Sequence, residues 1–114
     1  EKLGAIELKP KRMFYDYEAK YNPNAKTEHI IPVNISKKNY DKVTSIALKA
    51  HKLLKCRGVT RSDFRFNRNK FYLLETNTQP GMTSLSLVPE IAKYRNISFA
   101  QLINKILLDA SINK

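Results

Sequence analysis

Two carboxylates, an amide and a guanidinium on two neighbouring strand-like segments are the side chains of this sequence best suited to chemistry. They are Arg61, Asp63, Glu75 and Asn77. Carboxylate and amide oxygens are the donors that Mg²⁺ prefers when it also binds water and substrate phosphates. An arginine beside them indicates phosphate, because the planar guanidinium can hold two oxygens at once. An exposed face with a modest ion pair is the commoner use of these residue types, and the spacing alone leaves both interpretations open.

A β-hairpin would bring these side chains together. Residues 58–66 and 70–77 have the composition of strands, and the turn-forming residues 67–69 separate them. Because side chains alternate along a strand, Arg61 and Asp63 share one face of the first strand. On the second strand, alternation predicts one face for Phe71, Leu73, Glu75 and Asn77.

The register of this hairpin is a specific prediction. Pairing Asn67 with Phe71 across a three-residue loop decides which side chains face each other. The resulting pairs are Asp63 with Glu75 and Arg61 with Asn77. A slip of one residue would turn the side chains of one strand to the other face, so the site depends on this register.

The segment that follows the second strand carries no charge between residues 78 and 89, although the chain has a net charge of +11. Pro80 and Gly81 predict a turn, in which glycine lets the backbone come close to a ligand. Ser86 is placed to cap a helix that begins at Leu87. A helix start presents unpaired N–H groups and the positive end of the helix dipole, which favour a carboxylate or phosphate. An ordinary strand-to-helix connection explains the same residues equally well.

The other regular segments predict an α+β fold in one domain. Residues 3–8 have the pattern of a short strand, and residues 37–55 and 99–110 carry apolar side chains at helical spacing. Each helix follows a serine, and the second begins with the capping-box pair Ser98 and Gln101. We expect a largely antiparallel sheet that contains the hairpin and is covered by the first helix, with the C-terminal helix at one edge.

Residues 11–32 show no helical period and contain several tyrosines. A loop of more than about 12 to 15 residues inside a compact domain is usually functional or disordered. Flexible linkers are poor in aromatic residues. We therefore expect an ordered loop that reaches a ligand, with Lys20 and Tyr21 among its residues.

Composition limits the classes of protein that remain. The chain has 114 residues, and its net charge of +11 and pI near 9.9 could indicate nucleic-acid binding. Because the lysines and arginines are spread along the whole chain, a small basic nucleic-acid-binding module is kept only as an alternative. No segment reaches the roughly 20 apolar residues of a membrane-spanning helix. The single Cys56 excludes an intrachain disulfide and fits a reducing compartment.

Four segments, in this order, resemble the C-terminal part of the D-alanine:D-alanine ligase family, which belongs to the ATP-grasp superfamily. They are FYDYEAKY (14–21), GVTRSDFRF (58–66), FYLLETNTQPGMTSLSLVP (71–89) and SFAQLI (98–103). The combination of an R-x-D strand with an E-x-N strand and a P-G-M-T loop is specific. The resemblance implies a cytoplasmic enzyme that uses ATP to join two D-alanines through an acyl phosphate for peptidoglycan synthesis. A ligase with another acceptor, such as D-lactate, is a related alternative.

The resemblance also implies roles for single residues of the hairpin and the turn. Two Mg²⁺ ions, which Mn²⁺ could replace, would bind the ATP phosphates through Asp63, Glu75 and Asn77. Arg61 and the backbone amide of Gly81 would face the acyl phosphate and then the oxyanion formed from it.

Further roles implied by the resemblance concern the helix start and the long loop. Ser86 and the amide of Leu87 would receive the carboxylate of the second D-alanine. Lys20 would approach the transferred phosphoryl group, and Tyr21 would help to exclude water. The N-terminal and central ATP-binding domains of the family have no counterpart in residues 1–114. We therefore expect this C-terminal catalytic part to be inactive without the remainder of its polypeptide, and the full-length enzyme to be a homodimer.

Overall fold

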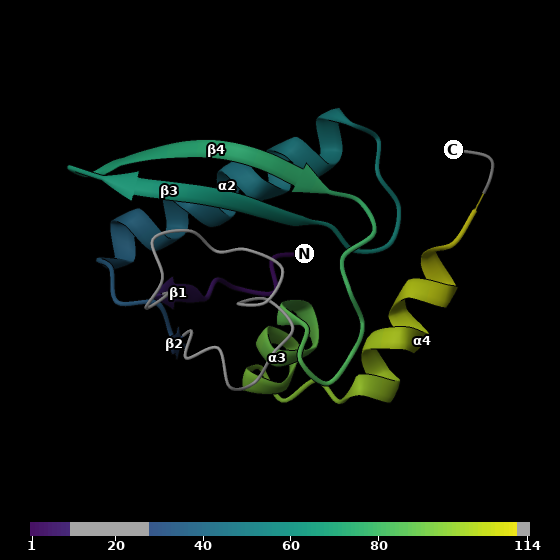
Figure 1. The fold of residues 1–114 in the computed structure, drawn as a ribbon. Helices are drawn as coiled ribbons and strands as arrows, with labels where there is room; N and C mark the ends of the chain where they lie inside the picture. The colour runs from purple at the N-terminus through teal and green to yellow at the C-terminus, as the bar shows by residue number, and fades with distance from the viewer. Residues whose placement is uncertain (10–27, 112–114) are drawn as a thin grey trace.

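The computed structural model describes residues 1–9 and 28–111 of the chain. Its elements, in chain order, are β1 (Glu7–Lys9), β2 (Glu28–Ile30), α2 (Lys37–Leu53), β3 (Arg61–Asn67), β4 (Lys70–Asn77), α3 (Leu87–Tyr94) and α4 (Phe99–Asp109). In Figure 1 the hairpin of β3 and β4 crosses the upper part of the molecule with α2 behind it, and α3 and α4 lie below. No helix in the two described ranges is long and apolar enough to cross a membrane.

The β3–β4 hairpin turns through two residues. Arg68 and Asn69 have positive φ angles of 52° and 63°, which is the backbone conformation that a tight two-residue hairpin turn requires. Asn67 consequently pairs with Lys70, and the predicted three-residue loop was wrong. Asparagine adopts the left-handed conformation more readily than most residues, because its short polar side chain can hydrogen-bond locally.

A bulge on β4 restores the predicted register at the site. The register shifts next to Asp63, where Leu74 is the extra residue on β4. One added residue compensates for the turn that is one residue shorter than predicted. Beyond the bulge the pairs are those predicted, Asp63 with Glu75 and Arg61 with Asn77.

The same bulge changes which β4 residues share a face. Residues directly opposite each other in an antiparallel pair point to the same side of the sheet. Phe71 lies opposite Phe66, and their ring centroids are 4.6 Å apart. Glu75 lies opposite Asp63, on the other side of the hairpin. The predicted single face for the odd-numbered residues of 71–77 was wrong, because simple alternation does not continue through a bulge.

Local capping explains where α2 and α4 begin. The Ser36 hydroxyl accepts a hydrogen bond from the Asn39 N–H at 3.1 Å. At α4 the Ser98 hydroxyl accepts from the Gln101 N–H at 3.1 Å, and the Gln101 side chain accepts from the Ser98 N–H at 2.8 Å. This reciprocal pair is the predicted capping box. α2 ends two residues earlier than predicted, since Lys55 adopts a left-handed φ of 55°.

The strands of the described residues form two separate antiparallel pairs, β1–β2 and β3–β4. The α+β class is confirmed, but this part of the chain contains no single larger sheet. β2 lies inside the segment predicted as a loop, and β1 starts later than the predicted strand 3–8. Sequence patterns miss this pair, because each strand has three residues and the partners are far apart in the chain.

The core lies between α3 and α4. Val88 and Ala92 of α3 and Leu102 of α4 are buried together. Partly buried side chains that pack against them are Leu3, Val59, Met82, Ile97 and Ile106. α4 therefore packs on α3. This packing gives α3, the helix that follows the β4–α3 loop, a fixed place in the fold.

Candidate active site

The polar face of the β3–β4 hairpin centres on one guanidinium. Arg61 donates to both carboxylate oxygens of Asp63, from Nε at 2.8 Å and from Nη2 at 3.1 Å. Its Nη2 atom also lies 3.8 Å from Oε1 of Glu75 on the opposite strand. The Arg61 side chain is 18% exposed and that of Glu75 is 56% exposed. Because one cation contacts both carboxylates, the two acidic side chains converge on a common position.

Asn77 completes an oxygen-donor set on the same face. It lies opposite Arg61 in the register, and its Oδ1 atom accepts a hydrogen bond from the Gln79 N–H at 2.9 Å, which orients the amide. On the opposite face of the hairpin, the hydroxyls of Ser62 and Thr76 lie 3.1 Å apart and join the two strands. The register thus places the three predicted metal ligands on one side of the hairpin.

The chemistry of this donor set fits Mg²⁺. Within residues 1–9 and 28–111, no three His, Cys, Asp or Glu side chains are grouped so that they could hold a metal ion. The hairpin offers two carboxylates and one amide oxygen. Mg²⁺ commonly binds through one or two carboxylates and completes its coordination with water and substrate phosphates. A structural zinc site would need four protein ligands, mostly Cys and His, and these residues do not form one.

The chain between β4 and α3 folds tightly around the Ser86 hydroxyl. Ser86 Oγ accepts a hydrogen bond from the Thr83 N–H at 2.9 Å and lies 2.8 Å from Thr83 Oγ1. A Cβ atom on Gly81 would lie 2.7 Å from the same Oγ atom, so a larger residue here would force the serine hydroxyl to shift. The importance of Thr83 was not predicted, although the T-x-x-S spacing is typical of a hydroxyl that bonds to nearby backbone.

Ser86 precedes α3 as predicted but does not cap it. Its hydroxyl makes no cap hydrogen bond to the described helix, because it is turned toward Thr83. The N–H groups of Leu87 and Val88 precede the first intrahelical hydrogen bond, and Pro89 has no N–H. The helix therefore begins with backbone donors that the serine leaves available, at the positive end of the dipole.

The predicted site residues that the structure describes fall in two neighbouring groups. Arg61, Asp63, Glu75 and Asn77 lie together on the hairpin. Gly81, Ser86 and Leu87 lie together at the start of α3. Residues 78–80 connect the two groups directly. The two remaining candidates, Lys20 and Tyr21, lie outside the described residues.

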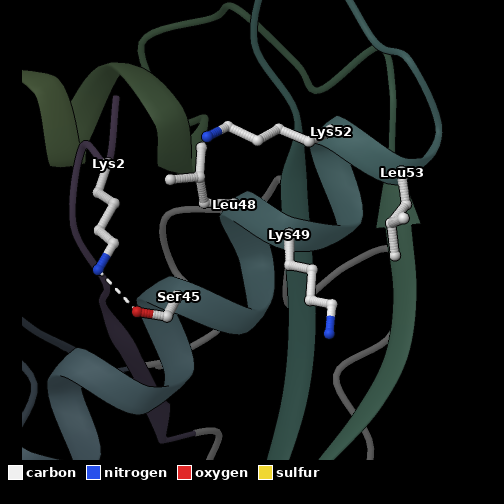
Figure 2. A pocket seen from close by; sticks show the side chains of 6 residues that line it. All are labelled: Lys2, Ser45, Leu48, Lys49, Lys52 and Leu53. Atoms are coloured by element: carbon white, nitrogen blue, oxygen red, sulfur yellow. Dashed lines mark hydrogen bonds between the residues drawn. The ribbon is translucent and has the colours of Figure 1, made fainter.

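A groove beside α2 contains none of these candidates. It is lined by Lys2, Ser45, Leu48, Lys49, Lys52 and Leu53. The Lys2 ammonium donates to the Ser45 hydroxyl at 2.8 Å, and Figure 2 shows the three lysine side chains pointing in different directions. Because the positive charges do not converge, the groove gives no support to the nucleic-acid alternative.

Comparison with known proteins shows which family the chain belongs to. The family model described as "D-ala D-ala ligase C-terminus" matches residues 1–108. The chain belongs to this family. The D-alanine–D-alanine ligase of Pelagibacter ubique (strain HTCC1062) is 69% identical over 98% of the chain, and that of Xanthobacter autotrophicus (strain ATCC BAA-1158 / Py2) is 45% identical over 98%. The chain spans only 37% and 38% of the length of these two relatives.

Solved structures of D-alanine–D-alanine ligases share the fold. The enzyme from Bacillus anthracis complexed with ATP is 29% identical and aligns with a TM-score of 0.74 over 93% of this chain and 34% of its own. A second structure of the Bacillus anthracis enzyme is 31% identical and aligns with a TM-score of 0.70 over 91% of this chain and 33% of its own. The described elements are thus those of an ATP-grasp ligase.

Proposed function

We propose that this chain supplies the metal, phosphate and acceptor-binding part of a D-alanine:D-alanine ligase, which joins two D-alanines at the expense of ATP through an acyl phosphate. The convergence of Asp63 and Glu75 on one position, with Asn77 on the same face, carries the proposal. Relatives named D-alanine–D-alanine ligase match 98% of the chain, and a solved relative is complexed with ATP. Because the chain spans little more than a third of these relatives, activity requires the rest of the polypeptide.

The hairpin would hold the phosphates of ATP. Asp63, Glu75 and Asn77 would ligate Mg²⁺ or Mn²⁺. A bound metal ion would neutralise negative charge on the phosphates during transfer of the γ-phosphoryl group. Arg61 is ordered by its two hydrogen bonds to Asp63. Little further ordering is needed for its guanidinium to contact a phosphoryl oxygen, which lowers the entropic cost of the step.

The start of α3 would bind the second D-alanine. Ser86 and the Leu87 amide would receive its carboxylate, and Thr83 holds the serine hydroxyl in place beside them. The amine nitrogen of this D-alanine would then form a bond to the acyl carbon, and the bond from that carbon to the phosphate oxygen would break. Arg61 and the Gly81 amide would stabilise the oxyanion that forms between these two events.

The experiment that tests this function measures ADP and dipeptide formation by the full-length polypeptide that contains the chain. With Mg²⁺ and ATP it should join D-alanine and leave L-alanine unreacted, whereas residues 1–114 alone should be inactive. Asp63→Asn and Glu75→Gln should each lower kcat by about 100-fold or more.

A matched control is Asp41→Asn, which removes an exposed carboxylate that pairs with Lys37 at 3.0 Å on α2. This variant should keep full activity. Wild-type rates in Asp63→Asn would contradict the metal role of the hairpin. If the enzyme formed an ester with D-lactate in preference to the dipeptide, D-lactate and not D-alanine would be its acceptor.

A further inference from the structure

A histidine on β2 contacts a glutamate in the first turn of α3. His29 Nδ1 lies 2.7 Å from Glu90 Oε1, and the two side chains are 27% and 35% exposed. A carboxylate oxygen can only accept a hydrogen bond, so the Nδ1–H group of the histidine is the donor. The contact joins residues that are 61 positions apart in the chain. Neither residue belongs to the two groups of the candidate active site.

The place of Glu90 in α3 connects this contact to the acceptor site. Glu90 is the acidic residue of the first turn, one turn along the helix from Ser86 and the Leu87 amide. A negative charge near a helix start is favourable for the helix, because it interacts with the positive end of the dipole. The same charge repels a second carboxylate that approaches that end.

We propose that His29 is a positioning residue of the acceptor site, because its hydrogen bond draws the Glu90 carboxylate toward β2 and away from the N–H groups of the α3 start. These N–H groups then remain available to the carboxylate of the second D-alanine. The inference rests on the proposed function. It adds a residue from β2 to a site otherwise built from β3, β4 and α3.

α3 keeps its place without this contact. At the opposite end of the helix, Arg95 donates from Nη1 to the backbone carbonyl oxygens of Lys2 and Leu3. Between the two ends, Val88 and Ala92 are buried in the core. Loss of one partly exposed hydrogen bond therefore leaves the helix in position. The effect of this loss on acceptor binding comes from the Glu90 carboxylate, which is no longer held by His29.

The test measures the KM for the acceptor D-alanine in the full-length enzyme. His29→Ala should raise this KM several-fold and leave kcat and the KM for ATP unchanged, because the freed Glu90 repels only a carboxylate at the helix start. Glu90→Gln in the His29→Ala background should return the KM to the wild-type value, since the amide carries no charge. Glu90→Gln alone should leave the KM unchanged or lower it.

Two results would overturn the inference. One is a wild-type KM for the acceptor in His29→Ala. The other is a KM in the double variant that is as high as in His29→Ala, which would mean that the contact has a structural role alone. If His29→Ala does not fold, His29→Gln keeps a donor and should resemble wild type, while His29→Met lacks one and should raise the KM. An inactive wild-type enzyme would overturn the proposed function and this inference with it, whereas unchanged variants of an active enzyme overturn the inference alone.

Discussion

A Cβ atom on Gly81 would lie 2.7 Å from the Oγ atom of Ser86, closer than the two atoms can approach without a shift. Gly81→Ala must therefore push the Ser86 hydroxyl away from its hydrogen bonds with Thr83. We expect the free energy of unfolding to fall by about 1–3 kcal/mol, the usual cost of overpacking, and the KM for the acceptor to rise. Urea denaturation and steady-state kinetics measure the two effects.

A second substitution separates this clash from other effects of the alanine. Ser86→Ala removes the Oγ atom, and the remaining Ser86 Cβ lies 3.5 Å from the added methyl group, an ordinary contact distance. Compared with Ser86→Ala alone, which already lacks the hydrogen bonds to Thr83, the double variant should lose little further stability. An equal loss from Gly81→Ala in the wild-type and Ser86→Ala backgrounds would show that the clash with the hydroxyl is not the cause.

Thr83 is predicted to support the loop through its hydroxyl. Thr83 Oγ1 lies 2.8 Å from Ser86 Oγ and accepts a hydrogen bond from the Leu85 N–H at 3.3 Å. Thr83→Val keeps the shape of the side chain and removes both interactions, so the free energy of unfolding should fall by about 1 kcal/mol. Thr83→Ser keeps the hydroxyl and should be close to wild type. Chemical denaturation of the three proteins compares them, and a serine variant as unstable as the valine variant would contradict the role of the hydroxyl.

Arg61 is predicted to act through its place between the carboxylates, and not through positive charge alone. Arg61→Met should lower kcat of the full-length enzyme by about 100-fold or more, as does loss of other groups that stabilise a developing oxyanion. Arg65 is exposed on the same strand and, by alternation, on the same face. Arg65→Met is therefore the matched control and should retain activity. Similar losses in both variants would mean that only the overall positive charge of the strand matters.

Local features of the fold were predictable from short sequence patterns. The capping pair Ser98 and Gln101 is complete within four residues, and the structure contains both of its hydrogen bonds. The pairing of Asp63 with Glu75 was also predicted correctly, although the turn was not. The shorter turn and the extra residue Leu74 offset each other. Nothing in the alternation marks Leu74 as a bulge, because it lies between Leu73 and Glu75 like any strand residue.

Features that depend on distant parts of the chain were not predictable in this way. The contact between His29 and Glu90 spans 61 positions, and the packing of α4 on α3 depends on the tertiary fold. Ser86 illustrates the limit most clearly. Its type and place predict a helix cap, but Thr83 offers its hydroxyl a competing set of hydrogen bonds, and these form instead.

Asp109 is predicted to make stability depend on pH at the end of α4. Its Oδ2 atom accepts a hydrogen bond from the Gly58 N–H at 2.6 Å, and its Oδ1 atom lies 3.4 Å from Nη1 of Arg57. The hydrogen bond, helped by the guanidinium charge, holds the pKa of the Asp109 carboxyl below its ordinary value. A pKa lowered by folding means that the carboxylate stabilises the folded state above about pH 4, near its pKa in the unfolded chain. This contribution is lost as the pH falls through the lowered pKa.

Asp109→Asn should therefore lower the thermal midpoint of unfolding at pH 7, and the difference from wild type should shrink to nothing once the wild-type carboxyl is protonated. Arg57→Gln leaves the hydrogen bond from Gly58 in place and should have a smaller effect at pH 7, since that bond is the main cause of the lowered pKa. Thermal unfolding between pH 7 and the acid range, followed by circular dichroism, measures both variants. A difference between Asp109→Asn and wild type that stayed constant with pH would show that the ionised carboxylate is not the stabilising group.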